Sequence, residues 1–225
     1  MVLEISSYHK LETRLAETAL RHGRSAGDID LLAVSKRQSI EAIKRVAGYG
    51  QRKFGENYLQ EAESKIAALA TFKLEWHFIG KLQSNKTRGV ATLFDWVHSV
   101  DRLKIAQRLN DQRPETAAPL NICVEVNIDS ESSKGGVTID EVPKFVDNLA
   151  VFPKLRIRGL MAMPAQQTCF EQQRKSFRRL REIFVKIDCP AFDTLSMGTS
   201  NDFEAAVSEG ATIVRIGTAL FGSRN

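Results

Sequence analysis

The sequence predicts an α/β protein whose strands close into a (β/α)8 barrel, the TIM-barrel architecture, with an extra helix in front. Along its 225 residues, compact apolar runs alternate about eight times with stretches long enough for one helix each. The runs lack polar alternation, which is typical of parallel strands buried on both faces. Eight such repeats favour a closed barrel. An open doubly wound sheet is the alternative, disfavoured because no GxGxxG motif follows the first strand.

The first quarter of the chain predicts a helix, a strand and a second helix. One face of the first helix is marked by residues at steps of three or four, namely Ile5, Tyr8, Leu11, Leu15, Ala19 and His22. Gly23 follows them directly, as is typical of a helix end. Residues 28–35, DIDLLAVS, then predict a buried strand, and residues 39–46 predict a helix.

Short apolar runs predict the remaining strands. Residues 52–58, RKFGENY, carry the second strand into a turn. The later strands are expected at residues 75–80, 95–100, 120–128, 155–161, 192–195 and 212–216. The longest helix between them is expected at residues 166–186, and a short helix ends at Gly210. No linker rich in Pro, Gly or Ser divides the chain, so residues 1–225 are expected to form a single domain.

Several classes of protein are excluded by composition. The apolar runs are broken by charges well before the about 20 residues that a membrane helix needs, and the first residues lack the pattern of a signal peptide. Cys123, Cys169 and Cys189 form no CxxC pair, which indicates buried, reduced thiols. No HExxH motif or cluster of carboxylates predicts a metal site. We therefore expect a cytoplasmic protein that binds neither a metal nor a membrane.

The net charge of +5 raises the question of a nucleic-acid partner. The densest basic stretch, residues 174–182, lies in a strongly amphipathic segment, so its charges are expected on the solvated face of a helix. No nucleic-acid-binding motif accompanies it. We expect no nucleic-acid partner, and the positive charge suits an anionic small ligand equally well.

Lys36 is the first candidate functional residue. In a parallel barrel, functional residues lie at the C-terminal ends of the strands, and Lys36 directly follows the run LLAVS. A partly desolvated lysine near other cations has a lowered pKa and becomes a nucleophile that forms a Schiff base with a carbonyl. The alternative is a solvated lysine whose stem merely lies along the strand end.

Two loops near the C-terminus are suited to a phosphate. The last strand ends at Gly217 and Thr218, where a glycine permits close approach and free N–H groups can donate to an anion. The loop before it carries Ser200, which alternatively serves only as the N-cap of the next helix. Loops after strands seven and eight form the usual phosphate site of such barrels. Together with Lys36, they predict a phosphorylated carbonyl ligand.

Specific motifs cover nearly the whole chain. They are LLAVSK ending at Lys36, FGENYLQE from Phe54, WHFIGKLQSNK from Trp76, HSVDR from His98, VNIDSESSKGGV from Val126, RGLMAMP from Arg158, LSMGTSNDFEAAVSEGAT from Leu195 and VRIGTALFG from Val214. In these motifs the sequence resembles the pyridoxal phosphate homeostasis protein family, small barrels similar to the N-terminal domain of alanine racemase.

The resemblance implies a barrel of pyridoxal phosphate (PLP) fold type III that carries pyridoxal 5'-phosphate as an internal aldimine on Lys36. It also implies that Arg215 faces the pyridine nitrogen of the cofactor, while Gly217 and Thr218 donate to its phosphate. Ser200 matches a serine that holds the phosphate from the preceding loop.

Three further residues at strand ends follow from the same resemblance. Asn57, in the GEN turn, is expected near the ring and the lysine. His77 and Ser99 are expected to line the pocket without bonding the cofactor strongly. The residues alone predict His77 as a packed core histidine, because it lies inside an apolar run.

The expected role is carriage of the cofactor, with no catalytic residues and no strong turnover. An arginine keeps its proton, so beside the pyridine nitrogen it leaves the ring unprotonated and a poorer electron sink. Related racemases add an opposing tyrosine from a second domain, whereas this chain ends at Asn225. None of Tyr8, Tyr49 and Tyr58 clearly supplies that group.

We therefore expect a protein of intracellular PLP homeostasis that is not an enzyme. Its expected partners are PLP and the apo forms of PLP-dependent enzymes, and an open cofactor mouth suits a monomer. The alternative is a weak PLP-dependent amino-acid racemase. A third class is a Schiff-base aldolase that acts on phosphorylated sugars without a cofactor.

Overall fold

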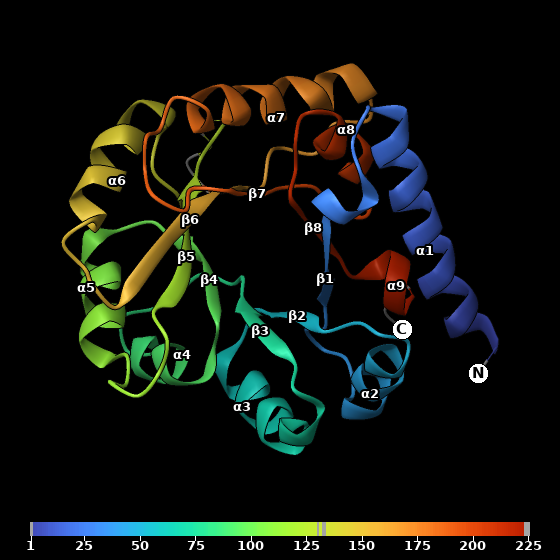
Figure 1. The fold of residues 1–225 in the computed structure, drawn as a ribbon, viewed down its shortest axis with the longest axis horizontal. Helices are drawn as coiled ribbons and strands as arrows, with labels where there is room; N and C mark the ends of the chain where they lie inside the picture. The colour runs from blue at the N-terminus through green and yellow to red at the C-terminus, as the bar shows by residue number, and fades with distance from the viewer. Residues whose placement is uncertain (1, 130, 132–133, 223–225) are drawn as a thin grey trace.

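The computed structural model describes residues 2–129, 131 and 134–222. Its strands are all parallel and close into a barrel in chain order, with the last strand paired to the first (Figure 1). The predicted barrel is therefore confirmed, and the open sheet is wrong. Within the VNIDSESSKGGV motif, Ser130, Ser132 and Ser133 lie outside the described residues.

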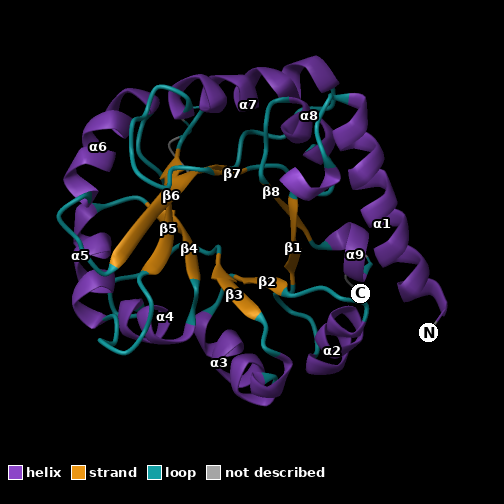
Figure 2. Cartoon of the chain, viewed as in Figure 1, coloured by secondary structure: helices purple, strands orange, loops and turns teal. Residues whose placement is uncertain are grey.

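The strands form an inner ring and the helices an outer ring (Figure 2). The strands are β1 (Asp30–Val34), β2 (Lys53–Glu56), β3 (Glu75–Phe78), β4 (Trp96–Val100), β5 (Leu120–Val126), β6 (Leu155–Ala162), β7 (Thr194–Ser196) and β8 (Ile213–Ile216). The α-helices are α1 (Val2–Arg21), α2 (Ile40–Gly48), α3 (Leu59–Ala68), α4 (Thr87–Leu93), α5 (Leu103–Gln112), α6 (Val142–Leu149), α7 (Phe170–Phe184), α8 (Phe203–Ser208) and α9 (Thr218–Phe221). Short 3-10 helices are Ala26–Asp28, Ala70–Phe72 and Ile139–Glu141.

Burial explains why the apolar runs of the sequence became these strands. Every residue of β4 and β8 is buried, and Leu32 and Ala33 of β1 are fully enclosed. One face of each strand fills the barrel while the other contacts the surrounding helices, so polar alternation is lost. Burial of both faces is the physical origin of the pattern that predicted the barrel.

The extra N-terminal helix is confirmed as α1, which lies outside the barrel beside α8 and α9 (Figure 1). Its buried face carries Leu11 and Leu15. On its outer side Arg14 forms an ion pair with Glu204 of α8 at 2.7 Å. The helix therefore covers the barrel near the junction of its first and last strands.

The long basic helix is also confirmed, as α7, although it is shorter at both ends than the expected residues 166–186. Phe177 and Leu180 are buried on its inner face. Arg174 and Arg178 both bond the carboxylate of Glu209, at 2.7 and 2.9 Å. The basic stretch thus lies on the mostly exposed face of a helix, as expected, and two of its arginines form ion pairs within the chain.

The expected helix end at Gly210 is confirmed as well. Gly210 has φ +95°, in the left-handed region, and the amide of Ala211 donates back to the carbonyl of Ala206 at 2.9 Å. Such a reversal satisfies carbonyls that the helix end would leave open. This reversal directs the chain into β8, the strand that carries Arg215.

The cysteines follow the expectation only in part. Cys123 is buried in β5, and burial raises the pKa of its thiol to about 12. Cys169 is exposed because it lies before the first turn of α7, and Cys189 is half-buried. The expected burial is therefore wrong for Cys169. No helix in the described part of the chain has the length and apolar character that crossing a membrane requires.

Candidate functional site

A cavity of about 590 Å3 opens at the C-terminal ends of the strands. The six residues proposed from the sequence all line it: Lys36, Asn57, Ser200, Arg215, Gly217 and Thr218. They lie near or after the C-terminal ends of β1, β2, β7 and β8, so the closing of the barrel is what brings them together. The volume falls within the range of small-molecule sites, about 300–1,000 Å3.

The turn that carries Lys36 is held on both sides. The preceding carbonyl, of Ser35, accepts a hydrogen bond from Lys65 Nζ of α3 at 2.7 Å. The following amide, of Arg37, donates to the Glu61 carboxylate of the same helix. Arg37 has φ +62°, a left-handed conformation that costs energy for a residue with a side chain. α3 therefore determines the direction in which the half-buried Lys36 leaves the strand.

A buried ion pair anchors this arrangement. Lys65 Nζ lies 2.8 Å from Glu56 Oε1 and 2.6 Å from Glu61 Oε1, so its three N–H groups are all used when the bond to Ser35 is counted. The hydroxyl of Ser35 donates to Glu56 Oε1 at 2.6 Å. Glu56 Oε2 has no partner among the described residues. Burial raises the pKa of the Glu56 carboxyl above its ordinary value.

Lys65→Met is expected to lower the free energy of unfolding by about 3–5 kcal/mol near pH 7, because it leaves a buried carboxylate without its cation. Lys65 counteracts the rise that burial causes in the Glu56 pKa, so its loss raises this pKa further and the folded variant gains more stability from protonation than folded wild type does. The deficit relative to wild type is therefore expected to shrink as the pH falls toward about 5. The deficit is measured by urea unfolding of the wild type and of Lys65→Met at pH 7 and pH 5.

Lys44→Met is the matched control, since Lys44 is exposed on α2. Its effect is expected to stay within about 0.5 kcal/mol at both pH values. A Lys65→Met deficit that is equally small, or that grows as the pH falls, would contradict the assigned role of the ion pair.

Arg215 forms the inner wall of the cavity. Its Nη1 donates to the carbonyl and hydroxyl oxygens of Ser196, at 2.5 and 2.8 Å, and its Nη2 donates to the carbonyl of Ala162 at 2.9 Å. The side chain is buried, and burial lowers its pKa to about 10. The guanidinium therefore stays protonated at neutral pH. Its hydrogen bonds to described residues use only the two terminal nitrogens.

The cavity lining after β7 and β8 offers donors to an anion. Thr218 begins α9 directly after Gly217, and the first N–H groups of a helix have no acceptor within it. Ser200 belongs to the same lining, where its Oγ accepts from the amide of Ala219 at 3.4 Å. A Cβ on Gly217 would lie 3.3 Å from the carbonyl oxygen of Val34. Hydroxyl and amide donors therefore gather within one concave surface.

The alternative role of Ser200 as an N-cap is wrong. The cap of α8 is Asp202, and the loop before it is held by Thr199, whose amide and hydroxyl both donate to the Asp202 carboxylate. Because α8 begins at Phe203, Ser200 lies too far ahead of the helix to cap it. Its side chain is directed to α9 instead.

Asn57 follows β2 and is half-buried at the cavity edge. Its Oδ1 is enclosed and has no hydrogen-bond partner among the described residues. The backbone of Asn57 packs so closely on Gly80 that a Cβ at Gly80 would lie 2.2 Å from the Asn57 carbonyl oxygen. The amide group of Asn57 is therefore placed by a contact that only glycine allows.

His77 and Ser99 do not line this cavity, so their expected place was wrong. Side chains alternate along β3, and the next inward position after His77 is Ile79, which does line it. His77 lies deeper, toward the N-terminal mouth, fully buried as a core histidine. Ser99 instead donates to the carbonyl of Gly80 at 2.5 Å.

None of the three tyrosines lines the cavity. Tyr8 is buried in α1, Tyr49 follows α2, and Tyr58 precedes α3 with half of its surface exposed. In the described chain, no tyrosine therefore stands across the cavity from Lys36.

Several residues of the site were missed in the sequence. Gln38, Gln166 and Asn201 add polar groups to the lining, yet they lie in loops without a periodic pattern. Lys65 did leave a signal, because it shares the buried face of α3 with Leu59. A lysine on an otherwise apolar stripe predicts a buried partner, here Glu56.

Comparison with known proteins agrees with this geometry. Residues 13–225 match the family described as alanine racemase, N-terminal domain. The chain is 51% identical over 216 residues to the pyridoxal phosphate homeostasis protein of Pseudomonas aeruginosa, covering 96% of this chain and 94% of that one. It is 48% identical over 221 residues to the protein of the same name from Escherichia coli K12, with the same coverage of 96% and 94%.

Among solved structures, PipY of Synechococcus elongatus, with PLP bound, superposes with a TM-score of 0.79 at 34% identity, covering 92% of this chain and all of that one. The alanine racemase of Corynebacterium glutamicum shares the fold, at 17% identity and a TM-score of 0.69, covering 98% of this chain and 62% of that one. The fold is thus the type III barrel. The chain belongs to the alanine racemase N-terminal domain family, with the pyridoxal phosphate homeostasis proteins.

Proposed function

We propose that this protein binds pyridoxal 5'-phosphate at the C-terminal mouth of the barrel and carries it, through a covalent link to Lys36, as part of PLP homeostasis. The proposal depends on one observation: a single cavity is lined by Lys36, Arg215, Ser200 and Thr218. The name of the relatives and the PLP bound to PipY support it.

The donor set fits the chemistry of this cofactor. PLP supplies an aldehyde, which condenses with a primary amine and releases water. Lys36 offers that amine in the lining of the cavity, and Ser200, Gly217 and Thr218 offer hydroxyl and amide donors to the phosphate in the same lining. Asn57, whose Oδ1 has no partner among the described residues, lines the same cavity.

Arg215 supports carriage over turnover. Both of its terminal nitrogens are bound to protein oxygens, so we assign its Nε–H to the ring nitrogen of the cofactor. A guanidinium that keeps its proton leaves that nitrogen unprotonated. The ring then withdraws electrons less strongly from a bound amino acid. Among the described residues that line the cavity there is no tyrosine that could exchange a proton with a bound amino acid on the face of the cofactor away from Lys36.

The remaining expectations stay predictions of this proposal. We infer that residues 1–225 act as one cofactor-binding domain, supported by the pairing of β8 with β1. Apo enzymes as recipients of the cofactor, a monomeric state and a cytoplasmic location belong to the same proposal.

The proposal is tested by the visible spectrum of the purified protein before and after borohydride, followed by peptide mapping of the reduced adduct. A coloured protein with the reduced adduct on Lys36 is expected. A colourless protein that takes up no added PLP would overturn the proposal and favour a cofactor-free aldolase.

Carriage and catalysis are separated by incubating the PLP-loaded protein with single-enantiomer amino acids. No sustained racemisation is expected. Racemisation that persists over many turnovers and disappears in Lys36→Ala would instead establish the racemase alternative.

A further inference from the structure

A continuous line of polar side chains runs through the interior of the barrel. Arg215 Nη1 at the cavity wall lies 2.8 Å from Ser196 Oγ, which lies 2.7 Å from His98 Nδ1. His98 Nε2 lies 2.8 Å from His77 Nδ1, and His77 Nε2 lies 2.7 Å from Glu75 Oε1. Four hydrogen bonds thus connect the cavity to the opposite mouth.

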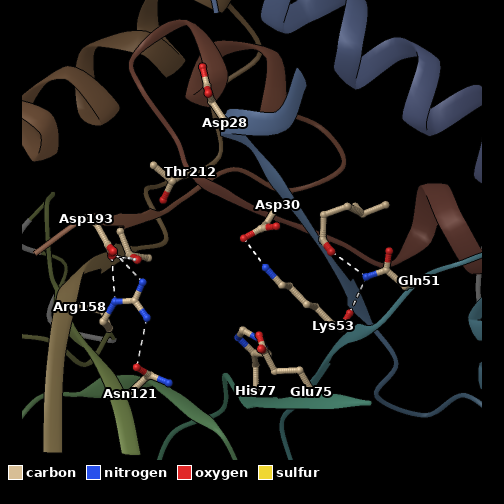
Figure 3. A network of polar contacts seen from close by, with 12 residues as sticks. Asp28, Asp30, Gln51, Lys53, Glu75, His77, Asn121, Arg158, Asp193 and Thr212 are labelled. Carbon is tan, nitrogen blue, oxygen red and sulfur yellow. Dashed lines mark hydrogen bonds and ion pairs between the residues drawn. The ribbon is translucent and has the colours of Figure 1, made fainter. Parts of the chain in front are cut away.

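The far end of this line is open to solvent. Glu75 has 39% of its side chain exposed in a polar hollow of about 380 Å3 at the N-terminal ends of the strands. The cations around it are already paired, Lys53 with Asp30 and Arg158 with Asp193 (Figure 3). Because both cations are paired with other carboxylates, the hydrogen bond of Glu75 is made to His77 in the barrel interior.

Packing restricts both imidazole rings. His77 stacks on the indole of Trp96, with ring centroids 5.3 Å apart and planes 7° from parallel. His77 and His98 are both fully buried. Ring rotation would break two hydrogen bonds at each histidine without access to water, so each nitrogen keeps its partner.

The two ends of the line determine the direction of every bond in it. Arg215 can only donate, so Ser196 Oγ accepts from it and is free to donate its own hydrogen to His98. At the other end an ionised Glu75 can only accept, so His77 donates from Nε2 and accepts at Nδ1. His98 must then donate from Nε2 and accept at Nδ1, in agreement with the first end.

The charge states fit this single direction. The hydrogen bond from His77 holds the pKa of Glu75 below its usual range. Burial lowers the pKa of both histidines from the ordinary value. A carboxylate and two neutral imidazoles, each with one donor and one acceptor, satisfy all four bonds.

We propose that Ser196, His98, His77 and Glu75 form a positioning relay that holds both imidazoles in the Nε2–H tautomer and restrains the guanidinium of Arg215 at the cavity wall. The relay stands independently of any ligand. Its consequence for the cofactor, a fixed direction of the Arg215 Nε–H toward the ring, rests on the proposed function.

The tautomers are read from long-range 1H–15N spectra of the 15N-labelled apo protein. The chain has four histidines, and His9→Gln and His22→Gln assign the signals of the two exposed ones. Both buried rings are expected to show a protonated Nε2 and an unprotonated Nδ1. A protonated Nδ1 on either His77 or His98 would overturn the relay.

The restraint on Arg215 is read from the rotation of its guanidinium about the Nε–Cζ bond, by exchange spectroscopy of the Nη signals. Ser196→Ala removes one acceptor of the guanidinium and the donor to His98. We expect rotation to become about tenfold faster, which corresponds to about 1.4 kcal/mol, and the His98 Nδ1 signal to shift. Ser196→Cys, which fills the same space with a weaker hydrogen-bonding group, is expected to change both signals in the same direction.

Ser99→Ala is the matched control, because Ser99 is a buried serine of β4 next to His98 that bonds Gly80 instead. It is expected to leave the tautomers and the Arg215 rotation unchanged. Unchanged Arg215 rotation in both Ser196 variants would refute the positioning role. The apo spectra need no cofactor, so failure of the protein to take up PLP would refute the proposed function and leave the relay standing.

Discussion

Lys36→Ala is expected to abolish the absorbance of the Schiff base and the borohydride-reduced adduct, while the protein stays folded. Lys36 is the one lysine among the described residues that line the cavity, and its half-buried side chain is not part of the hydrophobic core. The phosphate donors and Arg215 remain, so PLP should still bind reversibly. We expect its affinity to fall by about two orders of magnitude, about 2.7 kcal/mol, measured by fluorescence titration.

The matched control is Lys44→Ala, which removes an exposed lysine of α2, the helix that follows the Lys36 turn. It is expected to bind PLP and to form the adduct as wild type does. An adduct that persists in Lys36→Ala, or that maps to another lysine of the wild-type protein, would place the covalent link elsewhere and refute the role of Lys36.

Much of the fold was predictable because barrel strands are buried on both faces. The runs around Leu32 and Val97 therefore stand out as short and apolar. Parallel strands also align their C-terminal ends, so Lys36 and Arg215 could be placed at one mouth without knowledge of their distance. The first and last residues of the strands were less predictable. Asp28, expected in the first strand, instead belongs to a capping box with Ser25.

The orientation of side chains within a strand was harder to predict than the strand itself. His77 was expected at the pocket, yet the pocket begins two residues later at Ile79. The sequence does not reveal how far each strand extends toward the mouth, because that depends on the stagger between neighbouring strands. For the same reason the bond between His98 and Ser196, on strands far apart in the chain, could not be predicted.

Gly80→Ala is expected to have the largest effect of any single methyl group added at the site. The new Cβ would lie 2.2 Å from the carbonyl oxygen of Asn57 and 2.8 Å from its Cα, and both are backbone atoms. Neither can move without shifting the turn after β2. We expect the free energy of unfolding to fall by about 3 kcal/mol, measured by urea denaturation.

The same substitution tests whether Asn57 contributes to the site. If the shifted turn removes the Asn57 amide from the cavity, the folded fraction of Gly80→Ala should bind PLP about tenfold more weakly, about 1.4 kcal/mol. The donors on Ser200 and Thr218 come from other segments and should be unaffected, so inorganic phosphate should compete with PLP as in wild type. Unchanged PLP affinity would mean that Asn57 does not contact the ligand.

Gly48→Ala separates this contact from the general effect of replacing a glycine. Gly48 ends α2, and a Cβ there would meet no atom within 4 Å. An alanine at such a helical position reduces the freedom of the unfolded chain, so a gain of about 0.4–1 kcal/mol is expected. A loss for Gly80→Ala and a gain for Gly48→Ala would assign the loss to the contact between Gly80, which follows β3, and the Asn57 turn. If both substitutions destabilise the protein to a similar extent, the cause is the loss of glycine's backbone freedom. The contact with Gly80 would then not be what places Asn57.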